Sequence, residues 1–139
     1  VLVILIALGG IFLFYSLPRQ KPVQLFPATV NRDCAPWDGA AFTVSVQYDP
    51  ATMIIISIWQ SPKISHRSTF SFPDNSGQVG NAYLAPALSS YVELDGEVSF
   101  QRVEQGMPLD GRFNLTSERG EQFDGRFIAE WESQVVYCG

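Results

Sequence analysis

The sequence predicts a mostly β protein, an antiparallel barrel or sandwich of about seven or eight short strands, preceded by one N-terminal transmembrane helix. Three observations predict this fold. An uncharged apolar run opens the chain, apolar and polar residues alternate from residue 40 onward, and two cysteines bracket the alternating part. The 139 residues leave room for a single domain beside the helix.

The opening segment, residues 1–17, is apolar at 14 positions and carries no charge. A helix that is apolar on every side must be buried, and a domain of this size cannot enclose it, so we expect it to cross a membrane. Seventeen helical residues span only about 25 Å of the roughly 30 Å hydrocarbon core, so we expect part of the helix to precede Val1. Pro18 ends the helix because it lacks an amide hydrogen.

Two features of the sequence disagree on which side of the membrane the β domain lies. Arg19 and Lys21 follow the helix, and positive charge favours the cytoplasmic side. Two cysteines indicate a disulfide, which persists in oxidising compartments. We expect the cell membrane as the location, with the β domain on the extracytoplasmic (periplasmic or extracellular) side. A cleaved signal peptide is the alternative to a retained helix, although no small-x-small cleavage site precedes Pro18.

A proline-rich linker is expected over residues 18–36, since four prolines and little periodicity favour an extended connector. The extracytoplasmic β domain then occupies residues 37–139. We expect this division because regular alternation of apolar and polar residues begins only after the linker.

The first strands of the domain follow from local patterns. Alternation over residues 42–46 predicts a half-buried strand. The apolar run over residues 53–59 predicts a central strand buried on both faces, and a shorter strand is expected over residues 68–72. Residues 81–90 are compatible with either a strand or a short helical turn broken at Pro86.

The last third of the chain contains three Asp-Gly pairs, beginning at Asp95, Asp110 and Asp124, and the last two extend to Asp-Gly-Arg-Phe. Gly106 and Gly120 lie between them and suit hairpin loops, so we expect an antiparallel meander. We interpret the Asp-Gly pairs as turn residues rather than calcium ligands. The residues expected to face inward are Val98, Phe100, Phe113, Leu115, Phe123, Phe127, Ala129 and Trp131.

The two cysteines, Cys34 and Cys138, stand near the two ends of the β domain. A bond between them would close a loop of roughly 100 residues, worth about 4 to 5 kcal/mol in the chain-entropy model. It would also bring the two ends of the domain together, which favours a closed barrel or a tight sandwich. Two cysteines and one histidine are too few for a zinc site, an iron–sulfur cluster or a c-type haem.

A few residues of the sequence have side chains that could carry chemistry or binding. His66 is the single histidine and lies in a polar stretch, so we expect an exposed side chain rather than a catalytic base. Trp59 and Trp131 are expected to pack in the core, whereas Trp37 is expected to be an exposed contact residue. Asn114 begins an Asn-Leu-Thr glycosylation pattern on an outward face. No catalytic residue, metal ligand or cofactor-binding residue is predicted.

The functional expectation is a non-catalytic, single-pass accessory or structural subunit of a larger membrane protein complex, of which an electron-transfer complex is one example. Its partners would be other membrane-protein subunits, which the β domain covers or stabilises on the outer face, and the lipid bilayer through residues 1–17. The net charge of −5 and the absence of a basic run disfavour nucleic acid. The alternative is a membrane-tethered ligand-binding module for a sugar, a peptide or a small molecule. We do not expect an enzyme.

Overall fold

The computed structural model describes residues 20–86 and 90–139. The transmembrane helix expected over residues 1–17 lies outside these residues. Strands make up 60% of the described part, which contains no helix. Accordingly, none of the described residues form a helix with the length and apolar character needed to cross a membrane.

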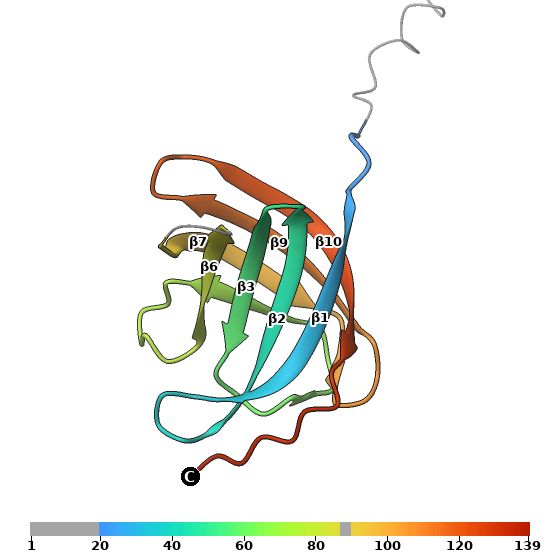
Figure 1. Cartoon of the computed structure of the whole chain (residues 1–139), viewed down its shortest axis with the longest axis vertical. Coiled ribbons are helices and arrows are strands. Elements are labelled where there is room, and N and C mark those ends of the chain that lie inside the picture. The colour runs from blue at the N-terminus through green and yellow to red at the C-terminus, as the bar shows by residue number, and fades with distance from the viewer. Residues whose placement is uncertain (1–19, 87–89) are drawn as a thin grey trace, which may run out of the picture.

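Within the described residues, seven strands close into a barrel, in the order β7-β6-β3-β2-β1-β10-β9 and back to β7 (Figure 1). The mostly β prediction is therefore confirmed, and the barrel is the correct one of its two alternatives. β5 pairs with the second half of β7, and β4 and β8 form a separate two-stranded sheet. The strands are β1 (Leu25–Cys34), β2 (Ala40–Asp49), β3 (Thr52–Ile58), β4 (Lys63–Ile64), β5 (Ser68–Phe72), β6 (Gly80–Pro86), β7 (Val92–Phe100), β8 (Val103–Glu104), β9 (Leu109–Ser117) and β10 (Gln122–Trp131).

The barrel closes through one parallel pair. β1 lies parallel to β10, from Leu25 opposite Arg126 to Val30 opposite Trp131, whereas the other pairs are antiparallel. The reason is geometric: seven strands that alternate in direction leave the first and the last pointing the same way. We call the end where β1 begins the proximal end, and the end where β1 and β10 finish the distal end (Figure 1).

β1 corrects the linker prediction. Residues 18–36 were expected to form an extended connector, but Leu25–Cys34 form a barrel strand. Its side chains alternate as in other strands, with Phe26 and Val30 buried. Pro27 is tolerated because it precedes Ala28, the first residue that pairs with β2, so its missing amide removes no hydrogen bond of that pair.

One cluster of buried side chains fills the barrel. All the inward residues predicted for the last third of the chain are buried except Trp131, which is half-buried and packs against the cluster. β3 is central in the sheet, between β2 and β6, as expected. Burial on both of its faces was wrong: Ile54, Ile56 and Ile58 are buried, while Met53 and Ile55 are half-buried on the outer face. A barrel covers only the inner face of each strand.

The Asp-Gly pairs are not turn residues, contrary to the prediction. They lie within β7, β9 and β10, with the glycines on the inward face. A Cβ atom on Gly125 would lie 2.4 Å from Cε2 of Phe26 and 2.9 Å from Cζ of Phe113. Gly111 and Gly125 therefore leave space for phenylalanine rings inside the barrel, whereas Gly96 allows close approach of the Asn114 backbone.

The predicted meander is confirmed. β7 pairs with β9, and β9 with β10, all antiparallel. Its loops contain Gly106 and Gly120 with φ of 88° and 83°, a region that favours glycine. The segment that the sequence left open between strand and helical turn is a strand over Gly80–Pro86.

Candidate functional site at the distal end of the barrel

The distal end is where several connections and the end of the chain meet. It comprises residues 35–39 between β1 and β2, residues 59–67 between β3 and β5, residues 101–108 between β7 and β9, and residues 132–139. The last of these segments crosses the mouth of the barrel below β10 (Figure 1). This end carries the disulfide, two tryptophan contacts and a basic hollow.

The disulfide joins Cys34, the last residue of β1, to Cys138, and its two Cα atoms lie 5.5 Å apart. The predicted pairing is therefore present, and it spans 104 positions of the chain. It holds the C-terminal segment across the distal end, where the amide of Glu132 also donates to the carbonyl of Val30 over 2.8 Å. The bridge thus fixes the position of a segment that belongs to no strand.

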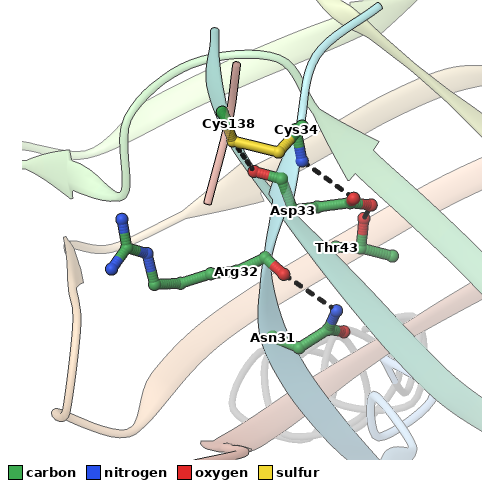
Figure 2. The surroundings of a disulfide bond; sticks show 6 residues. All are labelled: Asn31, Arg32, Asp33, Cys34, Thr43 and Cys138. Atoms are coloured by element: carbon green, nitrogen blue, oxygen red, sulfur yellow. Dashed lines mark hydrogen bonds between the residues drawn. A yellow bond between two sulfur atoms is a disulfide. The ribbon is translucent and has the colours of Figure 1, made fainter. Parts of the chain in front are cut away.

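A chain of polar side chains lies next to the disulfide on the outer surface (Figure 2). The Asp33 carboxylate accepts hydrogen bonds from the Cys34 amide at 2.8 Å and from the Thr43 hydroxyl at 2.7 Å. The Thr43 hydroxyl lies 3.1 Å from that of Ser57, and Asn81 stands opposite Ser57 on the next strand. The hydrogen bonds link the three neighbouring strands β1, β2 and β3, so we interpret them as a tie between these strands.

The hydroxyls of this polar chain have no histidine beside them among the described hydrogen bonds. A hydroxyl nucleophile is activated by an adjacent base. His66, the single histidine, is exposed in the connection between β4 and β5, as expected from the sequence. Its neighbour Ser68 donates to the carbonyl of His66 and not to the ring. The base that accepts from Thr43 is the Asp33 carboxylate, which also accepts from the Cys34 amide, and we interpret this contact as structural.

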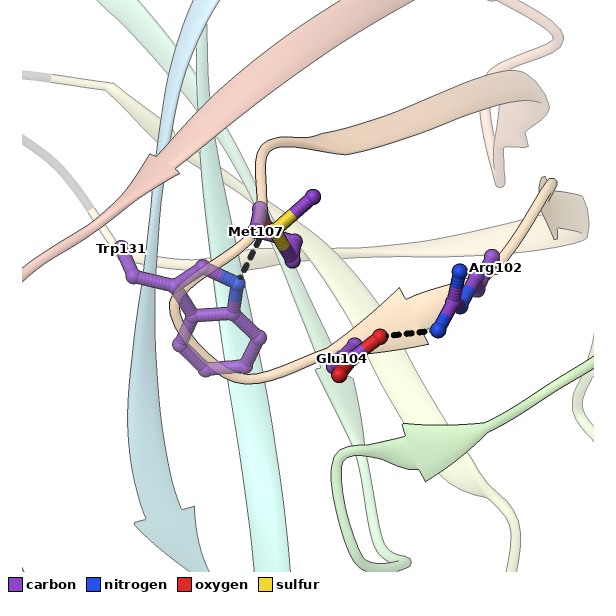
Figure 3. Close-up of polar contacts among 4 residues, drawn as sticks. All are labelled: Arg102, Glu104, Met107 and Trp131. Carbon is purple, nitrogen blue, oxygen red and sulfur yellow. Dashed lines mark hydrogen bonds and ion pairs between the residues drawn. The ribbon is translucent and has the colours of Figure 1, made fainter.

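Two tryptophan contacts stiffen the distal loops. Trp37 packs edge-on against Trp59, with ring centroids 5.7 Å apart, and remains 52% exposed. Trp37 is thus exposed as predicted. The core position expected for Trp59 is wrong, because this residue follows the last residue of β3, is half-buried and does not belong to the buried cluster. At the other side of the mouth, the Trp131 indole donates to the Met107 carbonyl at 2.8 Å (Figure 3).

Large apolar side chains are exposed around this end. Of the eight that are exposed in the described residues, four lie in the distal segments. These are Trp37 (52%), Met107 (56%), Val135 (69%) and Tyr137 (90%), and we call them the distal apolar ring. Three others, Val23, Leu25 and Ile128, belong to the seam between β1 and β10 and the residues before it. Exposed apolar side chains that gather in one region mark interaction surfaces.

A hollow of about 380 Å³ opens beside the ring, between β1 and the β4–β8 sheet. Arg32, Lys63, Arg102 and Glu104 line it. No sequence pattern indicates this hollow, since Arg32 lies far along the chain from Lys63, and both lie far from Arg102 and Glu104. Arg32 stands at an inward position of β1. A charged residue at an inward position indicates a possible binding site, but this signal depends on recognising β1 as a strand.

The other predicted residues lie elsewhere. Asn114 is exposed on the outer face of β9, as expected for an acceptor of a glycan. Asp110 binds Arg126 through two hydrogen bonds of 3.0 and 2.6 Å, and these raise the pKa of Arg126. Asp95 and Asp124 are exposed on β7 and β10. The described residues contain no group of three or more side chains placed to hold a metal ion.

Comparisons with known proteins give no relative for this chain: no family model, no curated protein and no solved structure matches it. The distal end therefore has to be interpreted from its own geometry. Exposed apolar side chains held on a disulfide-tied frame suit contact with another protein. Among the hydrogen bonds of the described residues, no serine or threonine hydroxyl is paired with the His66 ring.

Proposed function

We propose that the protein is a non-catalytic accessory or structural subunit of a larger membrane protein complex. A single N-terminal helix anchors it in the cell membrane, and the barrel contacts partner subunits on the extracytoplasmic side through its distal end. The distal apolar ring carries this proposal, because four large apolar side chains stand exposed there around one mouth of the barrel. Isolated apolar side chains on a surface need no explanation, whereas a gathered set does.

The filled interior supports the same function. Phe42, Phe100 and Phe127 are fully buried together with aliphatic side chains from all seven barrel strands. Barrels that carry a small ligand keep an interior cavity for it. Contact through the outer surface is therefore the use that this barrel favours.

The direction of β1 supports the choice of the distal end. β1 starts at the proximal end, which residues 20–24 enter, so an anchor preceding them would hold that end towards the membrane. The distal ring would then point away from the bilayer, towards the extramembrane parts of neighbouring subunits.

Site-specific photo-crosslinking in native membranes tests the proposal. A benzophenone amino acid would replace Trp37 or Tyr137 in the full-length chain, and Glu118, exposed in the β9–β10 turn at the proximal end, would be the control position. We expect one adduct of defined mass from positions 37 and 137, and none from 118. Mild detergent extraction would give a native assembly larger than the protein alone. A protein that migrates at its own mass and gives no distal adduct would refute the proposal.

A further inference from the structure

We infer that the distal hollow is a binding site for a phosphate group carried by a small molecule. The hollow measures about 380 Å³ and is lined by the cationic side chains of Arg32, Lys63 and Arg102, and by the hydroxyl-bearing Ser61 and Ser65. A volume of several hundred Å³ is in the range of small-molecule sites. This inference does not depend on the proposed subunit function.

The charge of the hollow points to an anion. Three cations line it against one carboxylate, Glu104, although the whole chain has a net charge of −5. A second hollow, of about 290 Å³ on the outer face of β7 and β9, shows the contrast: two arginines there are balanced by Glu97 and Asp124. The distal hollow thus has an excess of two positive charges. A phosphate monoester carries nearly two negative charges near neutral pH and would balance this excess.

Arg32 is the most informative residue of the site. It is half-buried at the end of β1, opposite Phe42 of β2, and its guanidinium extends away from the disulfide (Figure 2). Within the described residues, the guanidinium has no hydrogen bond or ion pair, whereas Arg102 and Arg126 each bind a carboxylate. Arg32 is therefore the arginine of the hollow whose donors, in the part of the chain described, are free to bind an anion.

The other two cations are held in place by the small β4–β8 sheet. Lys63 stands opposite Glu104 in this pair, and Arg102 binds the same Glu104 (Figure 3). Glu104 therefore positions Arg102, while the backbone pairing of β4 with β8 places Lys63 on the neighbouring strand. An arginine fork and a mobile ammonium are the usual phosphate ligands, and the serine hydroxyls can donate further hydrogen bonds.

Calorimetric titration of the full-length protein in detergent micelles at low salt tests the inference. The probes are inorganic phosphate and glycerol phosphate, which distinguish a free anion from a phosphate ester. We expect glycerol phosphate to bind, and Arg32→Gln to weaken its binding about tenfold or more, as for loss of a charged hydrogen bond. Lys63→Gln and Arg102→Gln should weaken binding as well, and added salt should weaken it in the wild type.

Arg112→Gln is the matched control, because Arg112 lines the charge-balanced hollow, and this variant should bind like the wild type. Tighter binding of glycerol phosphate than of inorganic phosphate would support the inference. It would show that the glycerol group of the ester also contacts the hollow. Equal binding of both would contradict the inference, because the hollow would then recognise the anion alone. The inference is also overturned if neither probe binds at millimolar concentration, if Arg32→Gln binds as the wild type does, or if Lys63→Gln and Arg102→Gln both do.

Discussion

Gly111 of β9 and Phe127 of β10 stand directly opposite each other, and the Phe127 ring occupies the space where a side chain at position 111 would lie. A Cβ atom on Gly111 would come within 2.4 Å of Cζ of Phe127. Because Phe127 is fully buried, the ring has no free space to move into. The Asp-Gly-Arg-Phe repeat thus supplies a small residue and a large one that pack against each other across neighbouring strands.

Gly111→Ala should therefore destabilise the barrel by about 1 to 3 kcal/mol, the usual cost of overpacking a core. The measurement is denaturant unfolding followed by tryptophan fluorescence. In a Phe127→Leu background the same substitution should cost less, since the ring that it meets has been removed. An equal cost in both backgrounds would contradict the steric explanation.

Reduction of the Cys34–Cys138 bridge should lower the free energy of unfolding by about 4 to 5 kcal/mol, because the bond closes a loop of roughly 100 residues in the unfolded chain. Thermal unfolding with and without a reductant measures this, while thiol labelling reports that reduction is complete. A Cys34→Ser/Cys138→Ser variant is the control and should not respond to the reductant. Complete labelling without a change in Tm would show that the bridge does not stabilise the fold.

The hydrogen bond from Trp131 to the Met107 carbonyl should hold the β8–β9 connection against β10. Trp131→Phe keeps an aromatic ring but removes the donor, and should cost about 1 kcal/mol. Hydrogen exchange over residues 105–108 should become faster in this variant. Met107→Leu keeps the backbone carbonyl and is the control, with an expected change within about 0.5 kcal/mol. Unchanged exchange in Trp131→Phe would argue against this bond.

Asp74, in the connection between β5 and β6, has a pKa below its ordinary value because Ser76 donates to its carboxylate through both the hydroxyl and the amide. A lowered pKa means that these bonds stabilise the folded protein above the pKa of the unfolded chain. The contribution is lost as the pH falls through the lower pKa of the folded state. A carboxyl NMR titration should show this low pKa, and Ser76→Ala should raise it.

Ser133→Ala provides the comparison, because Ser133 is exposed in the C-terminal segment, away from Asp74. It should leave the pKa of Asp74 unchanged. If Ser76→Ala also left that pKa unchanged, the hydroxyl would not be its cause.

Particular segments show why some of the fold was predictable. The strands of the last third alternate cleanly and are joined by short glycine loops, so the meander and its inward residues could be read from local patterns. The role of β1 could not be predicted from local patterns. The prolines and the lack of regular alternation indicate a connector, and only pairing with β2 and β10 makes this segment a strand.

The candidate site shows the same division. Exposure of Trp37 and the pairing of the cysteines followed from sequence position and from turn chemistry. The position of Trp59 did not, because it depends on where β3 ends and which face its last residues present. The basic hollow could not be predicted from the sequence, since residues 32, 63 and 102 share no motif.

By itself, the sequence determined the β class, the antiparallel meander and the disulfide between Cys34 and Cys138. The tertiary structure alone decided that the barrel closes with a parallel pair, that Gly111 and Gly125 face phenylalanine rings, and that three cations far apart in the chain line one hollow. Alternation of apolar and polar residues is a local property and specifies which face of a strand is buried. Which strands become neighbours depends on closure of the whole barrel, through contacts between residues far apart in the chain.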